Sequence, residues 1–175
     1  MSRVDLDDLP LERIDEIEPM WRALYEHHAS VAPHLAALTP LRTADQSWLA
    51  RRAEYERWLR EPRSFAVLAG AGGAPAGYAV GRVQPYVGSW ETGGTVGALE
   101  TLSVLPQARG AGVGRALMRG VRERFAARGV SVMEIAVVAG NDRAVSFYER
   151  EGAVPFQLYM RAPVGPGGAP DASEG

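Results

Sequence analysis

Apolar residues in the first third of the chain recur at steps of three and four, a spacing typical of amphipathic helices. A first helix is predicted from about residue 11, and Pro19 is expected to kink or split it. Its inward positions are Ile14, Ile17, Trp21, Leu24 and His28. Thr43 and Gln46 have the spacing of a capping box, which predicts a second helix that ends near Leu59.

Short β-prone runs separated by glycine and proline replace the helical spacing from residue 64 onward. The predicted strands cover residues 4–6, 65–69, 78–83, 95–104, 130–138 and 156–161. Residues 70–75 predict a hairpin loop, and residues 84–94 a surface loop. Two more helices are expected at 115–127 and 141–150. The order of elements indicates an α/β (α+β) fold with a mixed central sheet.

The size of the chain suits one domain, because 175 residues can bury a continuous core. We expect that domain to cover residues 1–161 and to be followed by a disordered tail at 162–175, which is rich in Gly, Pro and Ala. The chain contains no cysteine, which excludes disulfides and thiolate zinc sites and agrees with a cytoplasmic location. No apolar stretch approaches the roughly 18 residues of a membrane span, so no membrane association is expected.

The charge of the chain argues against a polyanion as partner, since a formal net charge of −2 supplies no basic field for nucleic acid. All basic residues are arginine. A phosphate loop of the Walker type requires a lysine, so nucleotide hydrolysis through that motif is excluded.

The stretch from Thr101 to Met118 leads from a strand through a glycine-rich turn into a helix. Glycines at 110, 112 and 114 allow the backbone to approach a ligand, and the helix start adds free N–H groups and the positive end of its dipole. A pyrophosphate would suit such a turn, although glycines also occupy turns for purely structural reasons. A dinucleotide-binding turn would need glycine at Arg115, which disfavours that alternative.

The pattern Gln107-x-x-Gly110-x-Gly112 resembles the acetyl-coenzyme A signature of the GNAT superfamily of N-acetyltransferases. A second segment, from Asn141 through Phe147-Tyr148 to Gly152, resembles the family's second motif. The resemblance implies a GNAT-like sheet of six to seven strands flanked by about four helices. Departures are the Gln at the first motif position, Arg115 after the last glycine, and Ala153 where an aromatic residue is common.

The resemblance also implies acetyl-CoA as co-substrate. No metal is expected, because the chain has no cysteine and its histidines have no acid at ligand spacing beyond Glu26. Its pyrophosphate would bind the amides from Arg109 to Arg115, and its pantetheine would pair with the strand near Leu102 and Val104. The implied coenzyme-binding residues are Leu102, Val104, Gln107, Arg109, Gly110, Ala111, Gly112, Val113, Gly114, Arg115, Asn141 and Tyr148.

Two residues are candidates for proton transfer. By the resemblance, Tyr148 donates a proton to the coenzyme sulfur; the alternative is that it only packs under the coenzyme. Glu100 is the candidate base, two residues before Leu102 and therefore expected on the same face of the strand; it could equally be a substrate anchor or a solvated edge charge. The chain's histidines, His27, His28 and His34, are alternative bases or ordinary surface and packing residues.

The function predicted from the sequence is transfer of an acetyl group from acetyl-CoA to a primary amine in a direct ternary complex. The acceptor is a small molecule or a protein amine, with the loop at 84–94, Tyr25, Tyr86 and Trp90 as candidate specificity residues. The alternative is a non-catalytic acyl-CoA-binding sensor or interaction module. A longer acyl donor stays open, and exposed strand edges are compatible with a homodimer.

Overall fold

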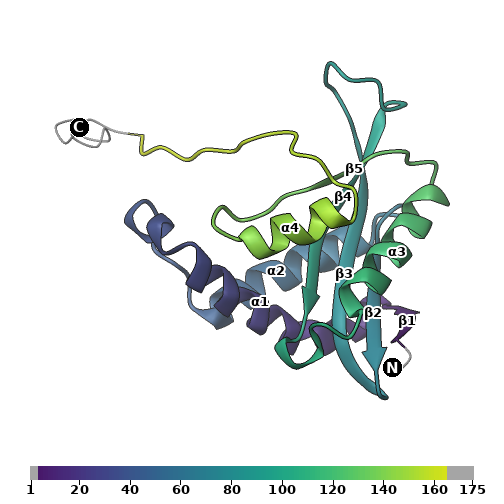
Figure 1. Cartoon of the computed structure of the whole chain (residues 1–175), viewed down its shortest axis with the longest axis horizontal. Helices are drawn as coiled ribbons and strands as arrows, with labels where there is room; N and C mark the ends of the chain where they lie inside the picture. The colour runs from purple at the N-terminus through teal and green to yellow at the C-terminus, as the bar shows by residue number, and fades with distance from the viewer. Residues whose placement is uncertain (1–3, 165–175) are drawn as a thin grey trace.

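The computed structural model describes residues 4–164, which fold into a central sheet with helices on both faces (Figure 1). The strands are β1 (Val4–Asp8), β2 (Phe65–Ala71), β3 (Ala74–Pro85), β4 (Thr95–Val104) and β5 (Met133–Ile135). The α-helices are α1 (Glu18–Val31), α2 (Ala44–Leu59), α3 (Val113–Ala126) and α4 (Asp142–Arg150). Short 3-10 helices are η1 (Leu11–Ile17), η2 (Pro33–Ala37) and η3 (Pro106–Ala108).

The sheet has the strand order β1-β2-β3-β4-β5. Neighbouring strands are antiparallel except β4 and β5, which run parallel. The pairing of β3 with β4 shifts by one residue between Val80, opposite Thr101, and Gly81, opposite Leu99. Glu100 therefore has no partner on β3 and forms a β-bulge, which redirects side chains on the bulged strand.

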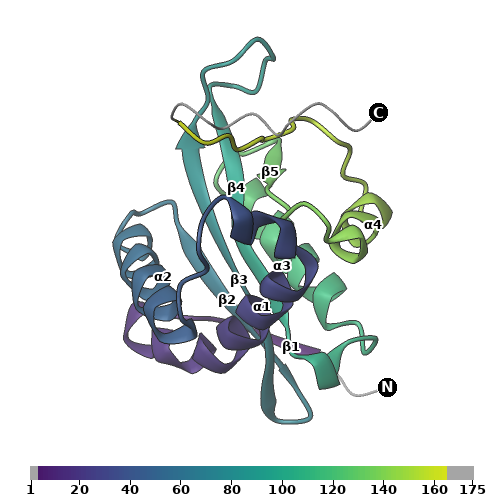
Figure 2. The ribbon, with the colours of Figure 1, turned by 90° about the vertical axis from the view of Figure 1, so that its left-hand side faces the viewer.

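Two apolar cores lie on opposite faces of the sheet. Trp21 of α1 and Trp58 of α2 belong to the core on one face, together with Tyr78 of β3. On the other face α3 contributes Leu117 and Val121 to the second core. Figure 2 views the molecule from the side of α1 and α2, with α3 behind the sheet and α4 at its edge. The fold is thus a three-layer arrangement with β4 in contact with both helical layers.

The helix boundaries follow local signals in the sequence. Pro19 lies in the first turn of α1 and separates it from η1, as the predicted split requires. Thr43 Oγ1 accepts a hydrogen bond from the Gln46 backbone, and the Gln46 side chain accepts one from the Thr43 backbone. This capping box stabilises the start of α2 by about 1 kcal/mol.

The hairpin between β2 and β3 is tighter than expected. Both strands continue into the segment predicted as a loop, and only Gly72 and Gly73 remain between them. Their φ angles are 62° and 83°, which glycine adopts without steric cost. Two residues with positive φ form the type of turn whose twist matches that of paired strands.

Two strand predictions need correction. The run at 130–138 contributes only the three residues of β5 to the sheet, and residues 156–161 form no strand, so the described sheet has five strands rather than six or seven. Leu158, Tyr159 and Met160 are instead more than 80% exposed. β-Propensity depends on a paired neighbour, and the short β5 offers little edge to pair with.

The predicted tail lies mostly outside the described residues, of which only 162–164 belong to it, and these have no regular structure. Within the described range, no helix combines the length and apolarity that crossing a membrane requires.

Candidate active site

The glycine turn between β4 and α3 adopts the backbone that its sequence predicts. Gly110 and Gly112 have φ angles of 83° and 85°, in the left-handed region that favours glycine. Gly112 is the N-cap residue of α3, and no side chain caps that helix. A Cβ at either glycine would meet open space, so the constraint is the backbone angle and the surface above it is unobstructed.

The N–H groups of this turn are available to a ligand. The first intrahelical bond of α3 runs from the Ala116 N–H to the Gly112 carbonyl. Within residues 4–164, no backbone N–H from Gly110 to Arg115 donates a hydrogen bond to the protein. Free amides at a helix start, combined with its positive dipole end, form a site for phosphate groups.

A cavity of about 440 Å³ opens above this turn. It is lined by residues of α1, β4, the glycine turn, α3 and α4. Its size falls within the 300–1,000 Å³ range of pockets that hold small molecules and cofactors. The cavity therefore has both the room and the donors that a diphosphate-containing ligand needs.

The strand β4 has a free edge beside this cavity. It pairs with β5 only at Gly97, Ala98 and Leu99, while Leu102 to Val104 line the cavity. An extended ligand can add to such an edge as an additional strand would. This arrangement agrees with the expected pantetheine position. The Arg109 guanidinium donates a 3.3 Å hydrogen bond to the Val104 carbonyl, which ties the turn to the strand end.

Asn141 holds the start of α4 next to α1. Its side-chain oxygen accepts a hydrogen bond from the Ala144 backbone at 3.2 Å, which caps the helix as predicted. The same oxygen lies 3.2 Å from Nε2 of His27. Because an amide oxygen only accepts, the His27 ring carries its proton on Nε2 in this contact. His27 is therefore a positioning contact between α1 and α4.

Tyr148 lies in the wall of the same cavity. Burial raises the pKa of its hydroxyl from 10 to about 12, because the phenolate form would lose its hydration. The neighbouring Phe147 packs against the ring of Tyr148, with centroids 5.2 Å apart, and closely approaches Gly114 at the start of α3. The phenol consequently stays protonated near neutral pH, as a proton donor must.

Most of the coenzyme residues expected from the sequence gather around this cavity. Those that line it are Leu102, Val104, Arg109, Gly110, Gly112, Val113, Gly114, Arg115, Asn141 and Tyr148. Gln107 and Ala111 are exposed and do not line it. Leu24 and His27 line it as well, although the sequence assigned Leu24 only to a packed helix face and His27 only as an alternative base. Helical spacing marks a packed face but not which part of that face borders a cavity.

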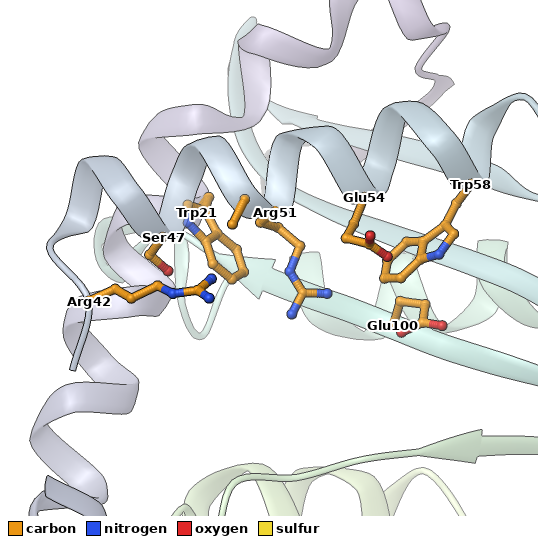
Figure 3. Close-up of a pocket in the computed structure, with 8 residues that line it drawn as sticks. Trp21, Arg42, Ser47, Arg51, Glu54, Trp58 and Glu100 are labelled. Carbon is orange, nitrogen blue, oxygen red and sulfur yellow. The ribbon is translucent and has the colours of Figure 1, made fainter. Parts of the chain in front are cut away.

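A second cavity, of about 420 Å³, lies between α2, α1 and β4 (Figure 3). It is lined by Trp21, Arg42, Ser47, Ala50, Arg51, Glu54, Trp58 and Glu100. The prediction that Glu100 shares a strand face with Leu102 is wrong. Glu100 borders this second cavity, whereas Leu102 packs against the core on the α3 side. The bulge at Glu100 breaks the alternation on which that prediction depended.

Glu100 is paired with Arg82 of β3, whose Nη1 lies 3.0 Å from its carboxylate. Arg82 also lies 3.6 Å from Glu61 and stacks over the Trp58 ring at 4.8 Å. The Glu100 side chain is partly buried, with 21% of its surface exposed. A carboxylate held at a cavity wall in this way can accept a proton from a bound group or anchor a cation.

Polar bonds fasten β4 to the helices beside this second cavity. Tyr55 of α2 forms a 2.6 Å hydrogen bond with Thr101, and its hydroxyl also lies 3.1 Å from that of Tyr78. The Ser103 hydroxyl donates to the Met20 carbonyl of α1 at 2.9 Å. All these groups are buried, so the bonds fix the position of the strand that borders both cavities.

The remaining candidates lie elsewhere. Burial lowers the pKa of His28, helped by the positive charges of His27 and Arg51, and His28 borders neither cavity. The Tyr25 hydroxyl donates to the Arg42 carbonyl at 2.6 Å, and Trp90 contacts Phe156. Tyr25, Tyr86, Trp90 and His34 line neither cavity. The second cavity depends instead on α2, which carries no recognisable motif.

The chain was compared with known proteins. It is 32% identical over 143 residues to a mycothiol acetyltransferase of Pseudarthrobacter chlorophenolicus; the match covers 81% of this chain and 40% of that relative. The chain thus spans less than half the length of this curated relative.

Solved structures share the fold. A GCN5-related N-acetyltransferase from Ralstonia eutropha superposes with a TM-score of 0.69 at 20% identity, over 93% of this chain and 99% of that one. An aminoglycoside N-acetyltransferase in complex with CoA superposes with a TM-score of 0.68 at 18% identity, over 94% and 96% of the two chains. The model of the acetyltransferase (GNAT) family matches residues 21–153. The chain therefore belongs to the acetyltransferase (GNAT) family, as its two sequence motifs predict.

Proposed function

We propose that the protein is an N-acetyltransferase that binds acetyl-CoA in the 440 Å³ cavity and transfers the acetyl group directly to a primary amine. The observation that carries this proposal is the turn from Gly110 to Arg115, whose free amides open onto that cavity. Family membership supports acetyl transfer in general. A solved relative in complex with CoA, similar in fold, supports the identity of the donor.

On the donor side, the amides from Gly110 to Arg115 would bind the pyrophosphate, and the free edge of β4 would pair with pantetheine. The thioester would then lie near Tyr148. No metal is part of the proposal, because a thioester reacts with amines once the two are aligned.

The reaction needs two proton transfers. The free amine attacks the thioester carbonyl, a C–N bond forms, and the C–S bond breaks. Glu100 would accept the proton that the acceptor ammonium loses, directly or through water, from the second cavity. Tyr148 would protonate the leaving thiolate, and the proton that the attacking nitrogen loses as the amide forms would return to Tyr148 through solvent.

A small-molecule amine is the favoured acceptor. The second cavity, of about 420 Å³, has room for a small molecule, and the solved relative of similar fold is named an aminoglycoside N-acetyltransferase. We place the activity in a single domain at residues 1–161 in the cytoplasm, in keeping with a chain that contains no cysteine.

The test is release of coenzyme A from acetyl-CoA across a panel of amines, followed with a thiol reagent. Because the protein has no cysteine, every thiol detected comes from the coenzyme. Calorimetric titration with CoA measures donor binding separately. Binding together with amine-dependent release supports the proposal, binding without release would support a non-catalytic acyl-CoA sensor, and no binding would contradict both.

A further inference from the structure

The second cavity contains an arginine, Arg51, that has no role in the proton transfer assigned to Glu100. The inference drawn from it rests on the proposed function. Arg51 projects from α2 into the cavity between Trp21 and Trp58 (Figure 3). Its guanidinium carbon lies 5.2 Å from the centre of the Trp21 ring, 5.7 Å from that of Tyr55 and 5.6 Å from that of Trp58. These rings hold the guanidinium in place by cation–π contacts.

The two carboxylates that line the cavity already have partners. Glu54 accepts a 2.6 Å hydrogen bond from Arg57, and Glu100 is paired with Arg82. Arg42 and Arg51 both line the cavity, and neither has a carboxylate within ion-pair distance in the part of the chain that the structure describes. Among those residues, only Arg51 of the two is held by aromatic rings. A fixed guanidinium without a counter-ion favours a bound anion, which it can hold through two parallel hydrogen bonds.

Two further donors beside the cavity lack acceptors. The indole N–H groups of Trp21 and Trp58 are buried and have no hydrogen-bond partner within residues 4–164. A buried donor without an acceptor costs free energy, but these two nitrogens are closed off from the cavity surface and are not donors to a ligand there. Anion binding at the cavity wall therefore depends on the Arg51 guanidinium, and the same wall carries the carboxylate of Glu100.

We propose that the acceptor is a small amine that also carries a carboxylate, such as an amino acid, with Arg51 binding the carboxylate and Glu100 facing the ammonium. The opposite charges at the wall match the two ends of such a zwitterion. A cavity of about 420 Å³ is large enough for a molecule of amino-acid size. Arg51 is a specificity-determining residue in this assignment and takes no part in proton transfer.

The experiment compares amino acids with their uncharged amides, which keep the amine and the side chain but remove the negative charge. Thiol release from acetyl-CoA gives kcat/KM for each member of a panel of such pairs, with simple alkyl amines included. The wild-type protein is expected to favour the carboxylate over the amide by about 10- to 100-fold, the range for hydrogen bonds to a charged group.

Variants test whether the preference for the carboxylate over the amide depends on Arg51. Arg51→Gln should reduce the preference to nearly one, and Arg51→Lys should restore part of it by returning the charge without the planar fork. Arg60→Gln is the matched control, because Arg60 follows α2, is exposed and borders neither cavity. It should keep the wild-type preference. Circular dichroism and calorimetric titration with CoA check that each variant is folded.

The outcomes separate the inference from the function on which it rests. Release with carboxylate-free amines only, or equal kcat/KM for acid and amide, overturns the inference and leaves the N-acetyltransferase standing. A preference that survives Arg51→Gln overturns it as well. Release with none of the amines overturns the inference and the proposed function together. A phosphate-bearing amine used better than every amino acid also overturns the carboxylate assignment.

Discussion

Tyr148 offers a direct test of the chemistry at the scale of a single hydroxyl group. Its pKa of about 12 keeps it protonated throughout the physiological range, so its proton is available to the leaving thiolate. Tyr148→Phe removes the proton and keeps the ring that packs beside Phe147. We expect kcat to fall by about ten- to a thousandfold while calorimetry finds the same affinity for CoA. Unchanged turnover would restrict Tyr148 to packing.

Glu100 permits a second test at this scale, which uses pH. Glu100→Gln removes the proton acceptor, and we expect kcat/KM at pH 7 to fall by about a hundredfold. The loss should shrink as the pH rises toward 9, because more of the acceptor is then already a free amine. The ratio of mutant to wild-type rates across this pH range provides the measurement.

Glu61→Gln is the control for that experiment. Glu61 also lies near Arg82, at 3.6 Å, but does not border the second cavity. It should keep near wild-type rates at every pH. An equal loss in both variants would mean that the Arg82 ion pairs, rather than a base, are responsible.

At the scale of an element, the φ angle of Gly112 at the start of α3 both ends the glycine turn and directs the backbone amides assigned to the pyrophosphate. Gly112 caps the helix with a φ of 85° and lies among the amides assigned to the pyrophosphate. Gly112→Ala should reduce the free energy of unfolding by about 1–2 kcal/mol, the cost of a left-handed conformation for a residue with a Cβ. It should also weaken CoA binding, because the backbone would relax away from the angle that directs those amides.

Gly73→Ala separates the two effects. Gly73 has a φ of 83°, but it lies in the turn between β2 and β3 and borders neither cavity. Denaturant unfolding should find a similar loss of stability in this variant, whereas its CoA affinity should equal that of the wild type. Equal affinity in both variants would mean that the turn at Gly112 does not bind the pyrophosphate.

Local signals explain which elements could be predicted from the sequence. Pro19 and the Thr43–Gln46 capping box specify helix ends through nearby atoms, and both act in the structure as expected. The strand predicted at 156–161 failed because a strand needs a neighbour, and composition alone does not reveal that β5 is short.

The residues of the site were likewise predictable where local signals place them and unpredictable where tertiary packing does. The residues around the glycine turn and Asn141 were predictable, because turn geometry and helix capping are encoded within a few positions. The face of the sheet on which the Glu100 side chain lies depends on a register shift relative to β3, which the sequence alone does not reveal. Trp21, Arg51 and Trp58 meet around one cavity only after α1 and α2 pack together, so helical spacing alone could not identify them as a site.

At the scale of the whole molecule, the coenzyme cavity joins parts that are distant in sequence. Its walls come from α1, β4, α3 and α4, so a bound coenzyme connects elements from both helical layers. At a hundredfold excess over Kd, CoA should stabilise the folded state by about 2.7 kcal/mol. For a protein of this size that corresponds to a rise in Tm of about 5–10 °C.

Differential scanning fluorimetry with and without CoA measures this shift. Adenosine, which lacks the phosphates and pantetheine, is the control and should leave Tm nearly unchanged. A Tm that is insensitive to saturating CoA would contradict the assigned cavity.

The bulge at Glu100 allows β4 to contribute to both the coenzyme cavity and the second cavity. Glu100 borders the second cavity and Leu102 to Val104 line the coenzyme cavity, so substitutions on α2 can alter which amine is accepted without disturbing the residues that hold the donor. Acceptor preference could then diversify through mutation while the donor stays constant. Deleting a single residue at this point would restore regular alternation and turn the side chains beyond the deletion to the opposite face, so the length of this strand decides which cavity each of its residues borders.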